Sequence, residues 1–303
     1  MRSSSCYEMR YTVDNAPNMW NIPYNVIRRA NGLIEAIDNK QVTDASESEI
    51  GQLYAEAKVV RALVHFDLVR IYGFPYTADE GASLGVPVML KPLGSDELPT
   101  RNTVAEVYTQ VVKDMTEAIG SGFMETKKNN GYITLWTAKA LLSRVYMNMN
   151  KNKEALELAE DVINNSPYTL WQNSEYVDAW NKDNGAHTNE MLFEFINESS
   201  DDWGDREGIA YLYNEDGYAD ATLARIIIER RKELVGEGQR FFDAMRNNET
   251  VVRYTDETNK GFHYSLDPES QKFDRTYFRA ILPIPASETD ATPSIAKQQN
   301  PGY

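Results

Sequence analysis

The segment from Glu49 to Tyr72 constrains the fold more than any other part of the chain. Apolar residues recur along it at helical spacing, at positions 53, 57, 60, 64, 68 and 71. From Leu63 to Ile71 they spread over more than one face, which a helix tolerates only when neighbours pack on both sides. Trp20 to Asp38 is a second segment with helical spacing. The two segments together favour a stack of helix pairs.

A repeat spacing occurs between Trp136 and Pro167. Tyr146, Ala155 and Pro167 are spaced like the tyrosine, alanine and proline of a tetratricopeptide repeat. In such a repeat the small alanine lets two antiparallel helices approach closely, and the proline ends the second helix. We therefore expect a mainly α-helical fold, a short α-solenoid.

Glycine and proline divide the rest of the chain. They crowd residues 73–101 at a density that a helix does not survive, so we expect a long loop there. Asn102 or Thr103 can cap the following helix, with Glu106 placed to complete a capping box from Thr103. The tail from Arg279 contains ILPIP and ends in QNPGY, where prolines forbid regular helix and indicate an extended strap across the surface.

The region after Pro167 has a different character. Residues 171–220 are rich in Trp, Tyr, Asn, Asp and Gly and have weak helical periodicity, which predicts irregular, loop-dominated structure. Helix returns from about Ala219 to Met245, with a break near Gly236 and Gly238.

Composition and charge limit the partners. The 303 residues are 42% hydrophobic and 25% charged, an ordinary globular composition with enough length for a sizeable core. A net charge of −15 repels polyanions, so we expect no nucleic acid partner. Cys6 is the only cysteine, and no apolar leader or membrane-spanning run occurs. The chain reads either as a cytosolic protein or as a fragment whose export signal lies upstream of residue 1.

Motifs of catalytic and metal sites are missing. The sequence has no HExxH, no Cys/His ligand spacing, no GxSxG, no phosphate-binding glycine loop and no dinucleotide fingerprint. His65 lies inside a helix and is interpreted as a packed residue. Two loops, NKDNG and NEDGYAD, resemble calcium loops only in composition, and no particular pair of acids suggests a glycoside hydrolase. We expect no cofactor, no metal and no catalytic residue.

Five separated motifs carry a family resemblance. They are AEAKVVRALVHFDLVRIYGFPY at 55–76, GVPV at 85–88, RNTVAEVYTQVVKDMTEAI, IIIERRKELVGEGQRFFDAMR, and PIPASE leading to QNPGY. In this order they resemble the SusD/RagB family of surface glycan-binding lipoproteins. The resemblance runs from about Trp20 to Tyr303.

The resemblance implies a SusD-like α-α superhelix. Tetratricopeptide-like helices over residues 1–185 would support a SusD/RagB C-terminal region with ligand-binding loops over residues 186–303, with no separable linker. It also implies a protein without catalytic activity, held by a lipid to the outer face of the outer membrane. Such a protein binds oligosaccharide for a TonB-dependent, SusC-like transporter. The export signal, lipidated cysteine and first helices of the family are not present in this chain, and Cys6 lacks the apolar run of a lipobox.

The charged stretch ERRKELVGEGQRFFDAMR, residues 229–246, could form a catalytic cluster, an anion-binding patch or a structural ion network. Acids and bases spaced four apart lie on adjoining helix faces and can pair with one another. Together with the resemblance, this spacing favours a structural network. Its residues are Glu229, Arg230, Glu233, Glu237, Gly238, Arg240 and Asp243.

Two functions are compatible with this fold: a glycan-binding protein, and a helical-repeat scaffold that binds only protein. A sugar site needs flat rings on loops, where they can cover a pyranose face while amides and carboxylates bond its hydroxyls. Residues 171–220 contain both types of group, which favours glycan binding. The predicted ligand residues are Trp180, Asn181, Asp183, Asn184, Asp201, Asp202, Trp203, Tyr211, Tyr213 and Tyr218, and Trp203 is the strongest because it lies in the polar segment SSDDWGD.

Overall fold

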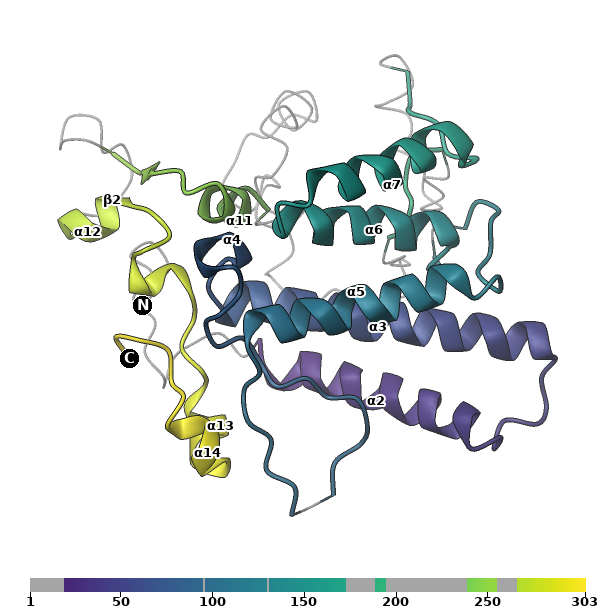
Figure 1. Cartoon of the computed structure of the whole chain (residues 1–303), viewed down its shortest axis with the longest axis horizontal. Helices are drawn as coiled ribbons and strands as arrows, with labels where there is room; N and C mark the ends of the chain where they lie inside the picture. The colour runs from purple at the N-terminus through teal and green to yellow at the C-terminus, as the bar shows by residue number, and fades with distance from the viewer. Residues whose placement is uncertain (1–18, 95, 130, 173–188, 195–238, 255–265) are drawn as a thin grey trace, which may run out of the picture.

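Five long helices form the body of the part of the protein that the structure describes. The computed structural model describes residues 19–94, 96–129, 131–172, 189–194, 239–254 and 266–303. Within them, α3 packs between α2 and α5, α5 packs on α6, and α6 pairs with α7, which gives the stack seen in Figure 1. The helices are α2 (Asn21–Asp38), α3 (Glu47–Tyr72), α5 (Val104–Gly120), α6 (Leu135–Asn148) and α7 (Asn152–Asn165). The predicted mainly α-helical fold class is confirmed.

Reciprocal capping boxes start two of these helices. The Thr103 hydroxyl accepts the Glu106 N–H at 3.2 Å, and the Glu106 carboxylate accepts the Thr103 N–H at 2.8 Å, as the sequence predicts. Ser46 and Glu49 make the same pair of contacts before α3. Because Ser46 caps α3, the helix begins at Glu47, two residues before the predicted start.

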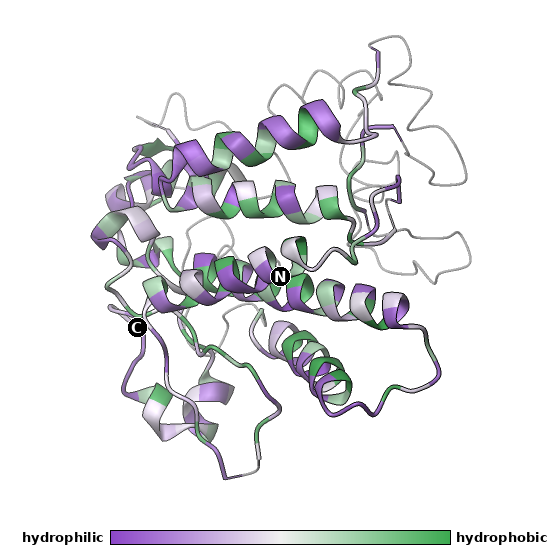
Figure 2. Cartoon of the chain, turned by 45° about the vertical axis from the view of Figure 1, so that its right-hand side comes forward, coloured by the Kyte–Doolittle hydropathy of each residue, from purple (hydrophilic) through white to green (hydrophobic). Residues whose placement is uncertain are grey.

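The α6–α7 pair has the predicted repeat geometry. Ala155 is buried, and the Ser143 hydroxyl of α6 donates to the Ala155 carbonyl of α7 at 2.8 Å, which is possible only at close helix approach. Helix α7 ends at Asn165, just before Pro167. Figure 2 shows apolar bands among the mainly hydrophilic residues of α7, the outermost described helix.

Shorter elements follow outside this stack. The described residues of 73–101 contain one brief helix, α4 (Tyr76–Asp79). They otherwise have neither helix nor strand, apart from an isolated bridge between Leu84 and Thr103. The C-terminal elements are α11 (Gln239–Arg246), β1 (Val251–Val252), α12 (Pro268–Gln271), β2 (Lys272–Phe273), η2 (Phe278–Ala280), α13 (Ala286–Ala291) and α14 (Pro293–Ala296). Strands β1 and β2 are antiparallel, with Val251 opposite Phe273. Most of the helix predicted for 219–245 lies outside the described residues.

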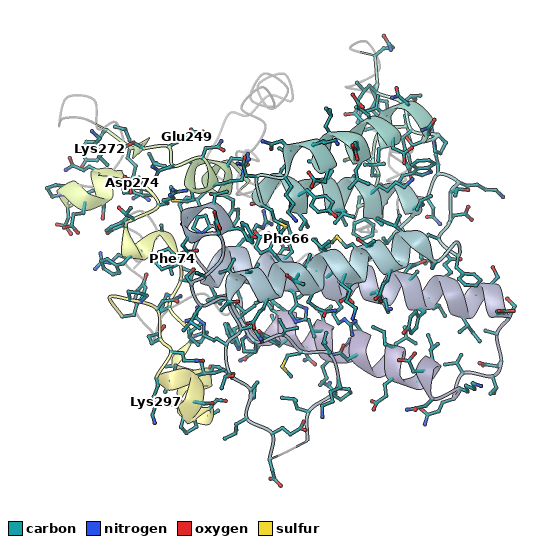
Figure 3. All side chains as sticks on the ribbon, viewed as in Figure 1. Phe66, Phe74, Glu249, Lys272, Asp274 and Lys297 are labelled. Atoms are coloured by element: carbon teal, nitrogen blue, oxygen red, sulfur yellow. The ribbon has the colours of Figure 1, made fainter. Side chains whose placement is uncertain are left out.

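An arginine between two phenylalanines joins α11 to the stack. The Arg70 guanidinium of α3 lies 4.4 Å from the ring centroid of Phe66 and 4.5 Å from that of Phe242 in α11. Cation–π contacts of this geometry are attractive. Figure 3 shows that Phe66 lies in the interior of the protein, whereas Lys272 and Asp274 lie at its edge near β2. The Arg70 contacts therefore connect α11 to the interior of the stack.

The C-terminal tail corrects one prediction. Residues 281–285 have neither helix nor strand, as expected, but they are mostly buried instead of lying on the surface, with Ile284 in the main core, and α13 and α14 are helical. The prolines do not prevent this, because Pro285 precedes α13 and Pro293 occupies the first position of α14. Helix starts tolerate proline, whose missing N–H needs no partner there.

A buried ion pair lies at the centre of the stack. Arg61 of α3 donates to both carboxylate oxygens of Asp114 in α5, at 2.8 and 2.7 Å. Its remaining terminal nitrogen donates to the side-chain oxygen of Asn31 in α2 at 2.9 Å, and Gln110 donates to Asp114 at 2.9 Å. The network ties three helices together.

We predict that Asp114→Ala lowers the free energy of unfolding by roughly 3–5 kcal/mol, because Arg61 is left buried without its counter-ion. Glu117→Ala is the matched control, since Glu117 also lies on α5 and pairs with a cation of α3, Lys58, but is 43% exposed. It should cost less than about 1 kcal/mol. Urea unfolding of both variants measures the difference, and equal costs would contradict a special role for the buried pair.

His65 is packed within α3, as predicted, and its tautomer is defined by its neighbours. The Met89 N–H donates to Nε2 at 3.1 Å, so Nδ1 carries the proton and donates to the Arg61 carbonyl at 2.8 Å. Burial lowers the pKa of His65 to about 4. The folded protein therefore contains the neutral imidazole at neutral pH.

Because the folded pKa lies below the unfolded value, protonation favours the unfolded chain. The contribution of His65 to stability is complete above pH 6.5 and is lost as the pH falls towards 4. Between pH 7 and pH 5 we expect a loss of about 2 kcal/mol from this group. Urea unfolding at the two pH values should show a smaller loss for His65→Gln than for the wild type; equal losses would contradict the assignment.

Candidate ligand-binding site

Arg101 and Asn300 fix the C-terminal tail against the end of α3. The Arg101 side chain donates to the carbonyls of Tyr72, Leu84 and Gly85, at 3.0, 3.0 and 2.7 Å, and to the carbonyl of Gln298 in the tail. The Asn300 amide donates to Tyr72 at 3.0 Å. Burial lowers the pKa of Arg101 to about 10. These contacts hold α13 and α14 near the start of α2.

A pocket of about 450 Å³ lies between α2, the loop 87–99 and the tail, which contributes Glu288 of α13 and Thr292 just before α14. We call it the α2 pocket. Its volume is within the range of small-molecule sites. The lining residues are Trp20, Asn21, Tyr24, Asn25, Ile27, Arg28, Asn31, Pro87, Met89, Lys91, Pro92, Leu93, Gly94, Glu97, Leu98, Pro99, Glu288 and Thr292.

Helix α2 contributes a polar stripe to this pocket. Asn21, Asn25 and Arg28 are spaced four and three residues apart, so they share one helix face, and all three are exposed. Arg28 donates to the Asn25 side-chain oxygen from Nε at 3.3 Å and from Nη2 at 3.1 Å. The pair offers N–H donors to a ligand.

Aromatic rings form a packed wall beside that stripe. Trp20 is only 2% exposed and packs against Tyr24 and Tyr72, at centroid distances of 5.1 and 4.8 Å. The Tyr24 hydroxyl donates to the Pro87 carbonyl at 2.9 Å. Burial, and then the nearby Glu288 carboxylate, raises the pKa of Tyr24 well above its ordinary value. Trp20 therefore offers no free ring face to a ligand.

The loop supplies a charged pair near the pocket mouth. Lys91 Nζ lies 2.9 Å from Glu97 Oε1, and the Gly94 N–H donates to Glu97 Oε2 at 3.2 Å. The Lys91 hydrogen bond, followed by that from Gly94, lowers the pKa of Glu97. Across the pocket, Glu288 accepts a hydrogen bond from the Thr292 hydroxyl at 3.2 Å. The pocket thus combines amides, charges and a hydroxyl, a set suited to binding hydroxylated ligands.

A second hollow, of about 500 Å³, lies at β2. Its rings pack on one another: Phe273 and Tyr277 are 5.6 Å apart, and Tyr277 and Phe278 are 5.4 Å apart. Because neighbouring rings occupy these faces, we take the α2 pocket as the candidate site.

The ten predicted ligand residues, which fall between Trp180 and Tyr218, all lie outside the described residues, so their grouping stays a prediction. Of the predicted ion network, Asp243 is described and pairs with Arg246 at 3.3 Å within α11. Arg240 lies in the same helix, and the other five lie outside the described part.

The sequence analysis missed Asn25 and Arg28. Their signal was the polar spacing of Asn21, Asn25 and Arg28 beside the aromatic pair Trp20 and Tyr24. Over the described residues, no group of three or more His, Cys, Asp or Glu side chains could hold a metal ion. No described helix has the length and apolar character needed to cross a bilayer.

Solved structures resemble this chain over nearly its full length. A SusD superfamily protein from Bacteroides thetaiotaomicron is 30% identical, with a TM-score of 0.77 over 99% of this chain and 90% of its own. A protein from Bacteroides vulgatus described as a putative sugar binding protein is 27% identical, with a TM-score of 0.83 over 100% of this chain and 89% of its own.

Family models and a curated relative agree with these structures. A SusD-like protein of Bacteroides ovatus is 26% identical over 186 residues, which cover 58% of this chain and 32% of that protein. The match thus spans about a third of the curated relatives' length. Residues 1–147 match a SusD-like model described as "Starch-binding associating with outer membrane", and residues 195–303 match the SusD family model. This chain belongs to the SusD/RagB family.

Proposed function

We propose that this protein is a non-catalytic glycan-binding protein that delivers oligosaccharide to a TonB-dependent, SusC-like transporter. The observation that carries the proposal is the α2 pocket, where the amides of Asn21 and Asn25 and the guanidinium of Arg28 face a space of small-ligand size. Amides both donate and accept hydrogen bonds, as sugar hydroxyls do. The side chains that line the pocket can hydrogen-bond a ligand, and binding alone requires no catalytic side chain.

The relatives support the same ligand class. One matching family model is described as starch-binding, and one similar solved structure as a putative sugar binding protein. Another structure, 23% identical with a TM-score of 0.50, was solved with a xylogluco-oligosaccharide. Sugar binding is described for those proteins, and we extend it to this chain on the basis of the pocket.

The proposed location is the outer face of the outer membrane, with a lipid anchor. It rests on the family description, which associates starch binding with the outer membrane. An anchored binding protein cannot move its ligand across a membrane by itself, so a transporter partner follows from this location.

The predicted loop residues remain part of the proposal. Trp203, with the other rings and short polar residues of 171–220, would supply the stacking faces that Trp20 cannot offer. The α2 pocket and this loop region are therefore separate candidates, which variants can distinguish.

A glycan array first identifies an oligosaccharide that the wild type binds. We predict that Arg28→Ala binds this oligosaccharide about tenfold more weakly, because a charged donor to a sugar hydroxyl is lost. Arg29→Ala is the matched control: Arg29 is the next residue of α2 and is also exposed, but it does not line the pocket. Calorimetry measures both variants. Equal affinities would remove the α2 pocket from consideration. A loss on the order of 1–3 kcal/mol in Trp203→Ala alone would place the site in the loop region.

The alternative, a scaffold that binds only protein, has one supporting observation. Leu156 and Ile163 on the outer side of α7 are 56% and 75% exposed. They are seven residues apart and thus on one face. Exposed apolar side chains on a helical repeat suit a protein partner, and in the proposed function this partner is the transporter.

We predict that the double variant Leu156→Asp, Ile163→Asp reduces co-purification of a TonB-dependent porin with the full-length lipoprotein after mild detergent extraction. The new charges would have to be buried in the interface without partners. Asn164→Asp is the control, since it adds a carboxylate at a neighbouring exposed position of α7. Unchanged recovery in the double variant would show that α7 does not form the docking surface. If the array finds no glycan while the porin is recovered, the scaffold function is favoured.

A further inference from the structure

The charges around the α2 pocket cancel. Among the residues that the structure describes, two cationic side chains, Arg28 and Lys91, and two anionic ones, Glu97 and Glu288, line it. The surrounding chain has a net charge of −15. An anionic ligand approaching this pocket therefore meets a repulsive average field and no net local attraction.

Contacts within the loop engage one of the two cations. Glu97 binds Lys91 at 2.9 Å, and the same carboxylate accepts the Gly94 N–H at 3.2 Å. This second contact holds Glu97 at the loop tip, so it remains beside Lys91. A ligand carboxylate or sulfate that pairs with Lys91 meets the negative charge of Glu97 at the same ammonium group.

The other cation, Arg28, is opposed by an acid. Its guanidinium donates to the neutral amide of Asn25, and Glu288 lies on the opposite wall. A ligand anion beside Arg28 is thus drawn to one charge and repelled by another. A neutral ligand meets none of these penalties, because its hydroxyls can donate to Glu288 and accept from Arg28 and the amides.

We infer that the α2 pocket selects neutral oligosaccharides against uronate or sulfated ones, and that Glu97 is the residue that determines this charge specificity. The inference rests on the proposed function, since it concerns the ligand of the same pocket. Specificity here comes from an unfavourable contact with the wrong ligand, added to favourable contacts with the right one.

Glu97→Gln tests the inference by a gain of binding. The amide keeps the shape of the side chain and an oxygen that can accept the Gly94 N–H, but it frees Lys91 from its counter-ion. Glu35→Gln is the matched control: Glu35 is an exposed residue of α2 that does not line the pocket, and the change in net charge is the same. Equal melting temperatures of the two variants and the wild type establish that all three are folded.

The probes are malto-, cello- and xylogluco-oligosaccharides, and oligogalacturonates and oligoguluronates of the same lengths. Calorimetry at low ionic strength should show that the wild type binds at least one neutral probe and no uronate. Glu97→Gln should bind uronate about fivefold to tenfold more tightly than Glu35→Gln does, from one unpaired cation near the surface. This gain should fall as the salt concentration is raised.

Two results would overturn the inference without contradicting glycan binding. In the first, the wild type binds a uronate probe as tightly as any neutral probe. In the second, Glu97→Gln binds uronate no more tightly than Glu35→Gln does, while both variants still bind the neutral probe. Failure of every probe with the wild type on a full glycan array would remove the proposed function, and this inference with it.

Discussion

The side chain of Arg101 is the contact on which the arrangement of the C-terminal tail depends. It donates to carbonyls from the end of α3, from the loop after it and from the tail, and no carboxylate contacts it among the hydrogen bonds of the described residues. Its charge is balanced instead by carbonyl dipoles, and Tyr72 is the last residue of α3, where the helix dipole is negative. Asn300 donates to the same carbonyl. One helix end thereby binds two segments that are almost 200 residues apart in the chain.

A second network holds the opposite wall of the pocket. Asn31 uses its oxygen to accept from Arg61 and its amide nitrogen to donate to the Met89 carbonyl, at 2.9 Å each. Tyr24 donates to Pro87, and His65 accepts from Met89. The base of the loop 87–99 is therefore fixed by buried polar groups of the helices. Its tip carries the exposed residues Leu93 and Leu98, so the same loop joins a rigid base to an accessible surface.

The helical stack could be predicted from the sequence, whereas the α2 pocket could not. Helical periodicity and capping are local, so α2, α3, α5 and the Thr103 box could be predicted from neighbouring residues. The Tyr146, Ala155 and Pro167 spacing also reports contacts within one helix pair. The α2 pocket needs Arg28 beside Glu97 and Glu288, and these residues lie on segments that are distant in the sequence and are joined by long-range contacts such as those of Asn31, Arg101 and Asn300. Prolines in the tail were interpreted as helix breakers, whereas their positions at helix starts make them compatible with α13 and α14.

The contact between Arg101 and Gln298 joins two parts of the chain that are synthesised at very different times. Helices α2 to α7 rest on local and sequential contacts, which form early because little chain must be ordered to make them. The wall that contains α13 requires Gln298 and Asn300, which leave the ribosome after every helix of the stack. A nascent chain therefore acquires its stack before its pocket. A chain that stopped before Gln298 would therefore hold the helical stack but lack the contacts that complete this wall of the pocket.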